Sequence, residues 1–130
     1  MVASLKGHGI QPSAQRVAVG AYVLAAQDHP SAEQVFRRVK KSFPMVSRAT
    51  VYNCLNLFVE KGLLRAYVLA PGRVVFDPKT ESHHHFIDEQ TGEIVDVAWE
   101  AVEVTRVERL KGFDVREYQV VMRGRRARKS

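Results

Sequence analysis

The chain has almost no cysteine, because Cys54 is the only one among its 130 residues. A single thiol excludes a disulfide framework within the chain and also the CxxC pairs that bind structural zinc. No run approaches the roughly 18 consecutive apolar residues that a membrane helix needs, and no signal-peptide pattern precedes Leu5. We therefore expect a cytoplasmic protein without a membrane partner, in which Cys54 is a small buried side chain.

Acidic residues are also too few to balance the charge. The chain has 20 Lys and Arg against 14 Asp and Glu, and its pI is near 9.8. This balance favours a polyanionic partner, nucleic acid before membrane. Much of the excess lies in residues 124–130, which we expect to form a basic flexible tail, although solubility alone would also explain it.

The N-terminal half has three stretches with a helical pattern, each expected to begin at a serine N-cap. They are residues 12–27, 31–42 and 48–61, with the caps Ser13, Ser31 and Ser47. Residues 63–77 then indicate two strands around the tight turn Ala70-Pro71-Gly72-Arg73. Three helices and a hairpin describe a winged helix, in which the second and third helices form a helix-turn-helix.

The third of these helices carries small and polar side chains near its N-terminus, which suits entry into the major groove of double-stranded DNA. Tyr52 would lay its ring against a thymine methyl, and Arg73 on the wing would contact the backbone. An ordinary solvated helix face is the alternative. The predicted DNA-contacting residues are Lys6, Arg16, Arg48, Thr50, Tyr52, Asn53 and Arg73.

Three consecutive histidines occupy positions 83–85. In a strand, His83 and His85 share one face and His84 takes the other. A hairpin folded about Gln90 and Thr91 places His85 opposite Asp96, close enough to share a metal ion. Asp77 lies just upstream. A solvated loop or the remnant of a purification tag is the alternative, but this run is internal and has strand-like flanks.

The remaining C-terminal residues give weaker patterns. Residues 99–110 predict a short helix, and residues 113–123 predict a final strand with Val115, Val120 and Met122 partly inward. The expected fold class is α+β, an N-terminal winged helix-turn-helix domain followed by a small α/β dimerisation domain. The expected divisions are residues 1–76, a hinge at 77–82, a metal-binding and dimerisation domain at 83–123, and the tail at 124–130.

Taken together, these residues resemble the ferric uptake regulator superfamily of bacterial metal-dependent repressors. The correspondence covers nearly the whole chain. It rests on Gly9-Ile10, Gln15-Arg16, Ser47-Arg48-Ala49-Thr50-Val51-Tyr52-Asn53, Val75-Phe76-Asp77, His83-His84-His85 and Glu93-Ile94-Val95-Asp96. An aspartate at position 96, rather than glutamate, is similar to the peroxide-sensing branch.

The resemblance implies one regulatory metal per subunit, bound by His29, Asp77, His83, His85 and Asp96. Three imidazoles and two carboxylates suit Fe2+ or Mn2+, with Zn2+ possible in vitro. The resemblance also implies that bound Fe2+ reduces peroxide and oxidises His29 or His83, which releases the metal and the DNA.

Structural zinc bound by four cysteines is not expected. The resemblance places the first cysteine pair of many members at Asp88 and Thr91 here, and the C-terminal pair is absent. We expect a homodimer, because the C-terminal half is too small to bury much core alone, and a palindromic operator.

Several alternatives stay open at this point. An iron-responsive or heme-responsive regulator of the same superfamily would share the histidine run. A two-histidine, one-carboxylate oxygenase would share the ligand types but would not need a helix-turn-helix, so we expect a repressor and not an enzyme. A metal-independent, nucleoid-type DNA binder would keep the same DNA affinity when a chelator is added. A second metal site would need His84 and an acidic partner such as Glu103.

Overall fold

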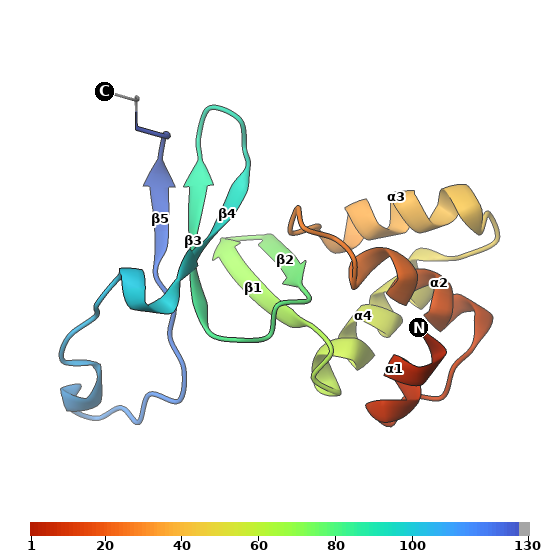
Figure 1. Cartoon of the computed structure of the whole chain (residues 1–130), viewed down its shortest axis with the longest axis horizontal. Helices are drawn as coiled ribbons and strands as arrows, with labels where there is room; N and C mark the ends of the chain where they lie inside the picture. Colours follow the sequence, from red (N-terminus) through yellow and green to blue (C-terminus); the bar gives the residue numbers. More distant parts are fainter. Residues whose placement is uncertain (128–130) are drawn as a thin grey trace. The chain divides into compact units, whose positions relative to one another are not determined.

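The computed structural model describes residues 1–127 and divides the chain into two compact units. The first unit is Met1–Thr80, and the second begins at Glu81. Figure 1 shows that the α-helices belong to the first unit and that the second unit contains a three-stranded sheet. No helix in the described part of the chain has the length and apolarity to span a bilayer.

The first unit has the helices and the hairpin expected of a winged helix. Its elements are α1 (Val2–Gly7), α2 (Ala14–Val23), α3 (Ala32–Ser42), α4 (Arg48–Glu60), β1 (Arg65–Ala70) and β2 (Arg73–Asp77). The strands β1 and β2 pair antiparallel, as predicted. All three predicted serine caps are confirmed, because Ser13, Ser31 and Ser47 each accept a hydrogen bond from a backbone N–H in the first turn. Ser31 forms the full capping box with Gln34.

The core of the first unit lies where α2, α3 and α4 pack together. Val51, Leu55 and Phe58 on α4 are fully buried, at the spacing of one helix face, which agrees with the helical pattern predicted for residues 48–61. Val35 on α3 and Val19 on α2 are fully buried in the same core. The packed face holds α4 in place and leaves its polar face available for contacts outside the protein.

Two features of the first unit differ from the prediction. The short helix α1 was not expected, because six residues without a side-chain cap carry little helical signal of their own. It forms because Leu5 is fully buried in the core. The helix α2 ends at Val23, before the predicted residue 27, and the chain then turns toward His29.

The second unit is built on a sheet with the strand order β4-β3-β5. Its strands are β3 (His83–Asp88), β4 (Ile94–Ala98) and β5 (Val121–Gly124). The antiparallel register of β3 and β4 pairs His85 with Asp96, as predicted, and Ile87 with Ile94. The strand β5 runs parallel to β3, which the sequence did not indicate.

The segment between β4 and β5 has little regular structure. The predicted helix within residues 99–110 is replaced by two 3-10 turns, η1 (Trp99–Ala101) and η2 (Val107–Arg109), since β-branched valines disfavour a helix here. The predicted strand 113–123 forms only from Val121, and Val115 is exposed rather than inward. Residues 128–130 of the predicted basic tail lie outside the described residues.

We expect that Leu55→Ala lowers the free energy of unfolding by about 2–5 kcal/mol, because it opens a cavity in the core of the first unit. Urea denaturation followed by circular dichroism measures this. The control is Asn56→Ala on the exposed face of the same helix, which should change stability by less than about 0.5 kcal/mol. Equal effects of the two variants would contradict the described packing of α4.

Candidate functional site

Two candidate ligands lie together in the first unit. His29 follows α2 and has a left-handed backbone, with φ of 53°, immediately before Pro30. The carbonyl oxygen of Pro30 accepts the N–H of Phe76 at 2.9 Å, which ties this loop to β2. This contact brings His29 beside Asp77, the last residue of β2, with His29 Nε2 3.1 Å from Asp77 Oδ2.

The carboxylate of Asp77 is held in one orientation. Its Oδ1 accepts the backbone N–H of Lys79 at 2.9 Å, so Oδ2 is the oxygen turned toward His29. An imidazole nitrogen and a carboxylate oxygen are atom types that N/O metal sites use as ligands. Because a left-handed backbone is uncommon for residues other than glycine, the loop geometry at His29 is a specific feature of this site.

Three further candidate ligands lie together in the second unit. His83 Nε2 is 3.3 Å and His85 Nε2 is 3.6 Å from the same oxygen, Oδ1 of Asp96. The two histidine rings are 4.6 Å apart between centroids. The alternation of β3 and its register with β4 produce this cluster, as the sequence pattern predicted. Both imidazoles are buried, whereas the Asp96 side chain is about one-third exposed.

The other nitrogen of each ring fixes where the proton lies. His83 Nδ1 donates to the carbonyl oxygen of Glu81 at 2.7 Å, and His85 Nδ1 donates to Oε1 of Gln119 at 2.8 Å. Because an oxygen of this kind can only accept, each neutral ring has its proton on Nδ1 and its lone pair on Nε2. Two lone pairs and a carboxylate oxygen thus face one another, and a cation would relieve their repulsion. This donor set fits a divalent metal ion.

His84 lies on the opposite face of β3 and has a different environment. Its Nδ1 accepts the N–H of Val120 at 3.0 Å, and its ring stacks on Trp99 with centroids 4.5 Å apart. A neutral ring with an acceptor Nδ1 has its proton on Nε2 and has no lone pair left for a metal. Among the described residues, Nε2 of His84 has no hydrogen-bond partner. These contacts argue against the second metal site that would need His84 and Glu103.

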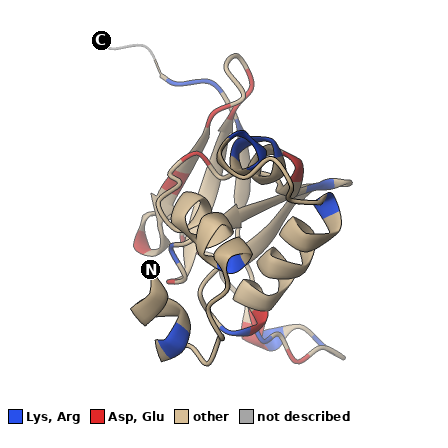
Figure 2. Cartoon of the chain, turned by 90° about the vertical axis from the view of Figure 1, so that its right-hand side faces the viewer, with Lys and Arg blue, Asp and Glu red and all other residues tan. Residues whose placement is uncertain are grey.

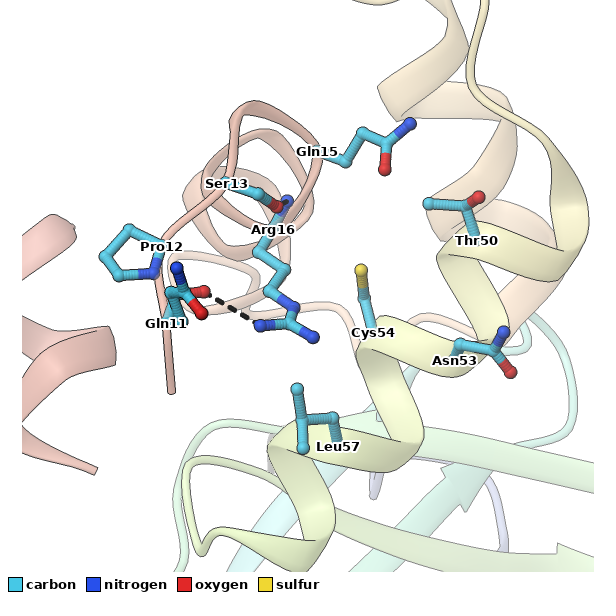
Figure 3. A pocket seen from close by; sticks show the side chains of 9 residues that line it. All are labelled: Gln11, Pro12, Ser13, Gln15, Arg16, Thr50, Asn53, Cys54 and Leu57. Carbon is cyan, nitrogen blue, oxygen red and sulfur yellow. Dashed lines mark hydrogen bonds between the residues drawn. The ribbon is translucent and has the colours of Figure 1, made fainter. Parts of the chain in front are cut away.

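Three of the predicted DNA-contacting residues line one hollow in the first unit. Arg16 from α2 and Thr50 and Asn53 from α4 surround a space of about 420 Å3. Figure 3 shows the Arg16 side chain reaching into this space, where its Nη1 donates to the carbonyl oxygen of Gln11 at 2.9 Å. The remaining donors of the guanidinium and the amide of Asn53 can bind phosphate oxygens or base edges.

The other predicted DNA contacts are distributed over the same unit. Tyr52 on α4 is 42% exposed, which leaves the ring free to contact a base. Lys6 on α1 and Arg73 at the start of β2 are exposed. Lys or Arg occurs in each of the four helices (Figure 2). A spread of cations over one unit suits contacts to a phosphate backbone.

Arg48 has a partner that the sequence analysis did not find. Its Nε and Nη2 donate to the two carboxylate oxygens of Glu33 at 3.0 and 2.9 Å, and its guanidinium lies 4.7 Å from the Phe36 ring centroid. The hydrogen bond from Arg48 holds the pKa of Glu33 below its ordinary value. The pair joins the start of α3 to the start of α4, so Arg48 orients α4 through this contact.

Asp88 holds the turn between β3 and β4. Its Oδ1 accepts the N–H groups of Gln90 at 2.9 Å and Thr91 at 3.3 Å, and its carbonyl oxygen accepts the N–H of Gly92 at 2.7 Å. An aspartate that bonds its own backbone in this way is a recognised turn former. A carboxylate and backbone groups therefore close this turn, at the position where the resemblance places a cysteine pair in many relatives.

Sequence comparisons identify related proteins. The model of the Ferric uptake regulator family matches residues 7–123. The peroxide-responsive repressor PerR of Staphylococcus aureus is 32% identical over 125 residues, which are 95% of this chain and 84% of that protein.

Solved structures give the same result for the fold. The ferric uptake regulator from Pseudomonas aeruginosa with manganese has a TM-score of 0.71 and 26% identity and covers 97% of each chain. The Campylobacter jejuni peroxide stress regulator has a TM-score of 0.68 and 25% identity and covers 100% of this chain and 98% of its own. The predicted fold class, a winged helix followed by a small dimerisation domain, is confirmed.

Burial raises the pKa of the Cys54 thiol, and the nearby Arg16 guanidinium opposes this only in part. Since the thiolate is the reactive form, we expect iodoacetamide at pH 8 to alkylate folded protein at least about tenfold more slowly than protein unfolded in urea. Mass spectrometry of timed samples measures both rates. Equal rates would show that Cys54 is accessible.

The same pKa shift has a consequence for stability. The unfolded thiol ionises as the pH rises through about 8.5, while the folded thiol stays neutral to higher pH. The contribution of Cys54 to stability is therefore fully present below that pH and is lost as the pH rises toward the folded pKa.

Proposed function

Because the chain belongs to the ferric uptake regulator family and is similar to peroxide-responsive repressors within it, we propose that it is a cytoplasmic transcriptional repressor. It binds double-stranded DNA with an affinity that depends on one divalent metal ion per subunit, and it loses that ion on exposure to peroxide. Members of this family are transcriptional regulators rather than enzymes, and we expect no catalytic turnover.

The observation that carries this proposal is the set of acceptors around Asp96. The Nε2 lone pairs of His83 and His85 face one carboxylate oxygen at 3.3 and 3.6 Å. These separations exceed the usual length of a charge-assisted hydrogen bond, about 2.7–2.9 Å, but leave room for a cation. In our proposal the same ion also binds His29 and Asp77 of the first unit, which gives the five-ligand set expected from the resemblance.

A shared ion would connect the two units. Only five residues separate Asp77 from His83, so even a fully extended connection spans about 20 Å. The ligands are therefore never far apart along the chain. An ion that binds both groups restricts the units to the arrangements in which both groups reach it. Its differential affinity for the DNA-binding arrangement would shift the population toward that form.

We further propose that the protein acts as a homodimer on a palindromic operator. Family members bind DNA and act as dimers. The second unit is small and exposes large apolar side chains between β4 and β5, with Leu110 51% and Phe113 75% exposed. A second copy would cover such residues and would present two α4 helices to successive major-groove half-sites.

Within each half-site, Thr50, Tyr52 and Asn53 of α4 would contact base edges. Arg16 in the hollow beside α4 and Lys6 and Arg73 on exposed positions would bind phosphates, which position the protein without reading sequence. Arg48 would contribute mainly through its ion pair with Glu33.

The ligand types are compatible with Fe2+ or Mn2+, and with Zn2+ in vitro. Bound Fe2+ would catalyse cleavage of the O–O bond of H2O2 with no net change in its own oxidation state. One oxygen of H2O2 is transferred to an imidazole carbon of His29 or His83 and the other leaves as water, so the ring is oxidised by two electrons. An oxidised ring is a poorer ligand, and loss of the ion then releases the DNA.

Metal removal tests the regulatory proposal. We expect chelation of Mn2+ to weaken binding to an operator duplex, selected from random DNA with Mn2+ present, by roughly 5–150-fold. His85→Ala and Asp96→Ala should weaken DNA binding in Mn2+ to the chelated level, because each removes a proposed ligand. Fluorescence anisotropy with labelled duplex measures the affinities.

The matched control for these variants is His8→Ala, which removes an exposed histidine of the first unit. It should keep the full response to Mn2+. Operator affinity that is the same with Mn2+ and with chelator would reject metal-dependent repression and would favour a metal-independent DNA binder.

Peroxide sensing has a separate test. Protein loaded with Fe2+ and treated with dilute H2O2 should gain one oxygen atom on the peptide that contains His29 or His83, whereas protein loaded with Mn2+ should not. Tandem mass spectrometry locates the added oxygen. An iron-loaded protein that keeps both peptides unmodified and stays bound to DNA would reject peroxide sensing in favour of an iron-responsive regulator.

A further inference from the structure

One side chain outside the proposed ligand set contacts a ligand directly. Gln119 lies just before β5, and its Oε1 accepts the Nδ1 proton of His85 at 2.8 Å across a sequence separation of 34 residues. Gln119 is half-buried, and both groups belong to the second unit.

Backbone contacts hold Gln119 at this position. The next residue, Val120, donates its N–H to His84 Nδ1 at 3.0 Å, and its carbonyl oxygen accepts the N–H of His85 at 3.1 Å. The parallel pairing of β3 and β5 continues this contact, with His85 opposite Val121. The segment before β5 is therefore attached to β3 at the two histidines, and the amide of Gln119 has a fixed place beside His85.

The hydrogen bond determines which nitrogen of His85 has a lone pair. A neutral imidazole has one proton, and the partner of one nitrogen decides the state of the other. With the proton on Nδ1, Nε2 offers its lone pair toward Asp96 Oδ1 at 3.6 Å. With the proton on Nε2, the same ring would donate a hydrogen bond to Asp96. His85 Nε2 would then have no lone pair to offer a metal.

The Nδ1 protons of the two histidines in the cluster have different kinds of acceptor. His83 is held by the backbone carbonyl of Glu81 at 2.7 Å, which no substitution can remove. His85 is held by a side chain, which evolution or an experimenter can change. Hydrogen bonds of this kind to ligand histidines typically change metal affinity by about 10–100-fold when they are lost.

We propose that Gln119 is a positioning residue of the metal site, which holds His85 in the Nδ1-protonated form and prevents a competing hydrogen bond from His85 to Asp96. This inference rests on the proposed metal-binding function. The metal affinity would then also depend on the position of β5, because the segment that leads into that strand provides the acceptor for His85.

The test compares Gln119→Leu with Gln119→Glu, which keeps an oxygen acceptor, and with Gln90→Leu as a matched control on an exposed glutamine of the same unit. Isothermal titration with Mn2+ should show affinity weaker by about 10–100-fold in Gln119→Leu. Gln119→Glu should restore most of the affinity, and Gln90→Leu should match the unchanged protein.

Nitrogen-15 chemical shifts of the histidine rings in the metal-free protein provide a second measurement. The unchanged protein should show His85 protonated on Nδ1, and Gln119→Leu should move the His85 proton toward Nε2 while His83 keeps its shifts. If Gln119→Leu fails to fold by circular dichroism, the His85 shifts of the unchanged protein and of Gln119→Glu decide the question.

The outcomes separate this inference from the proposed function. Equal Mn2+ affinity in Gln119→Leu and Gln90→Leu, or His85 protonated on Nε2 in the unchanged protein, would overturn the role of Gln119 and leave the metal site standing. Absence of Mn2+ binding by the unchanged protein would reject the proposed function, while the ring shifts would still report on the contact between Gln119 and His85.

Discussion

The candidate metal site depends on the hydrogen bonds that fix two imidazole rings through their Nδ1 atoms. A backbone carbonyl at Glu81 and the amide oxygen of Gln119 each accept an Nδ1 proton, so that His83 and His85 turn their Nε2 lone pairs toward Asp96. Without these anchors the rings could satisfy the carboxylate themselves by hydrogen bonding. With them, two Nε2 lone pairs and a carboxylate oxygen face one another, an arrangement that a positive ion would stabilise.

The parts of the structure that depend on short-range rules were predictable from sequence. Serine caps at positions 13, 31 and 47 are confirmed because the cap bonds a backbone N–H within its own first turn. The register that pairs His85 with Asp96 is confirmed because hairpin length and strand alternation together leave one solution. The cluster of His83, His85 and Asp96 could therefore be predicted from residues alone, whereas His29 entered only through the resemblance to a family.

The features that were missed all depend on contacts between distant residues. The helix α1 forms because Leu5 reaches the core, and β5 is placed by a parallel pairing with a strand more than 30 residues earlier. Neither the bidentate pair of Glu33 and Arg48 nor the bond from His85 to Gln119 has a local sequence pattern. Arg48, which stays a predicted DNA contact, therefore also has a carboxylate partner within the protein.

The turn closed by Asp88 bears on how long an oxidised form of the protein would persist. This hairpin is held by hydrogen bonds to a carboxylate, and the one thiol of the chain is buried elsewhere. Oxidants therefore cannot form a disulfide within the chain, and cellular thiol reductants have no such disulfide to reduce. If the proposed reaction oxidises a ring carbon, thiol reductants do not reverse it. The oxidised chain then persists until it is degraded and replaced by newly synthesised protein.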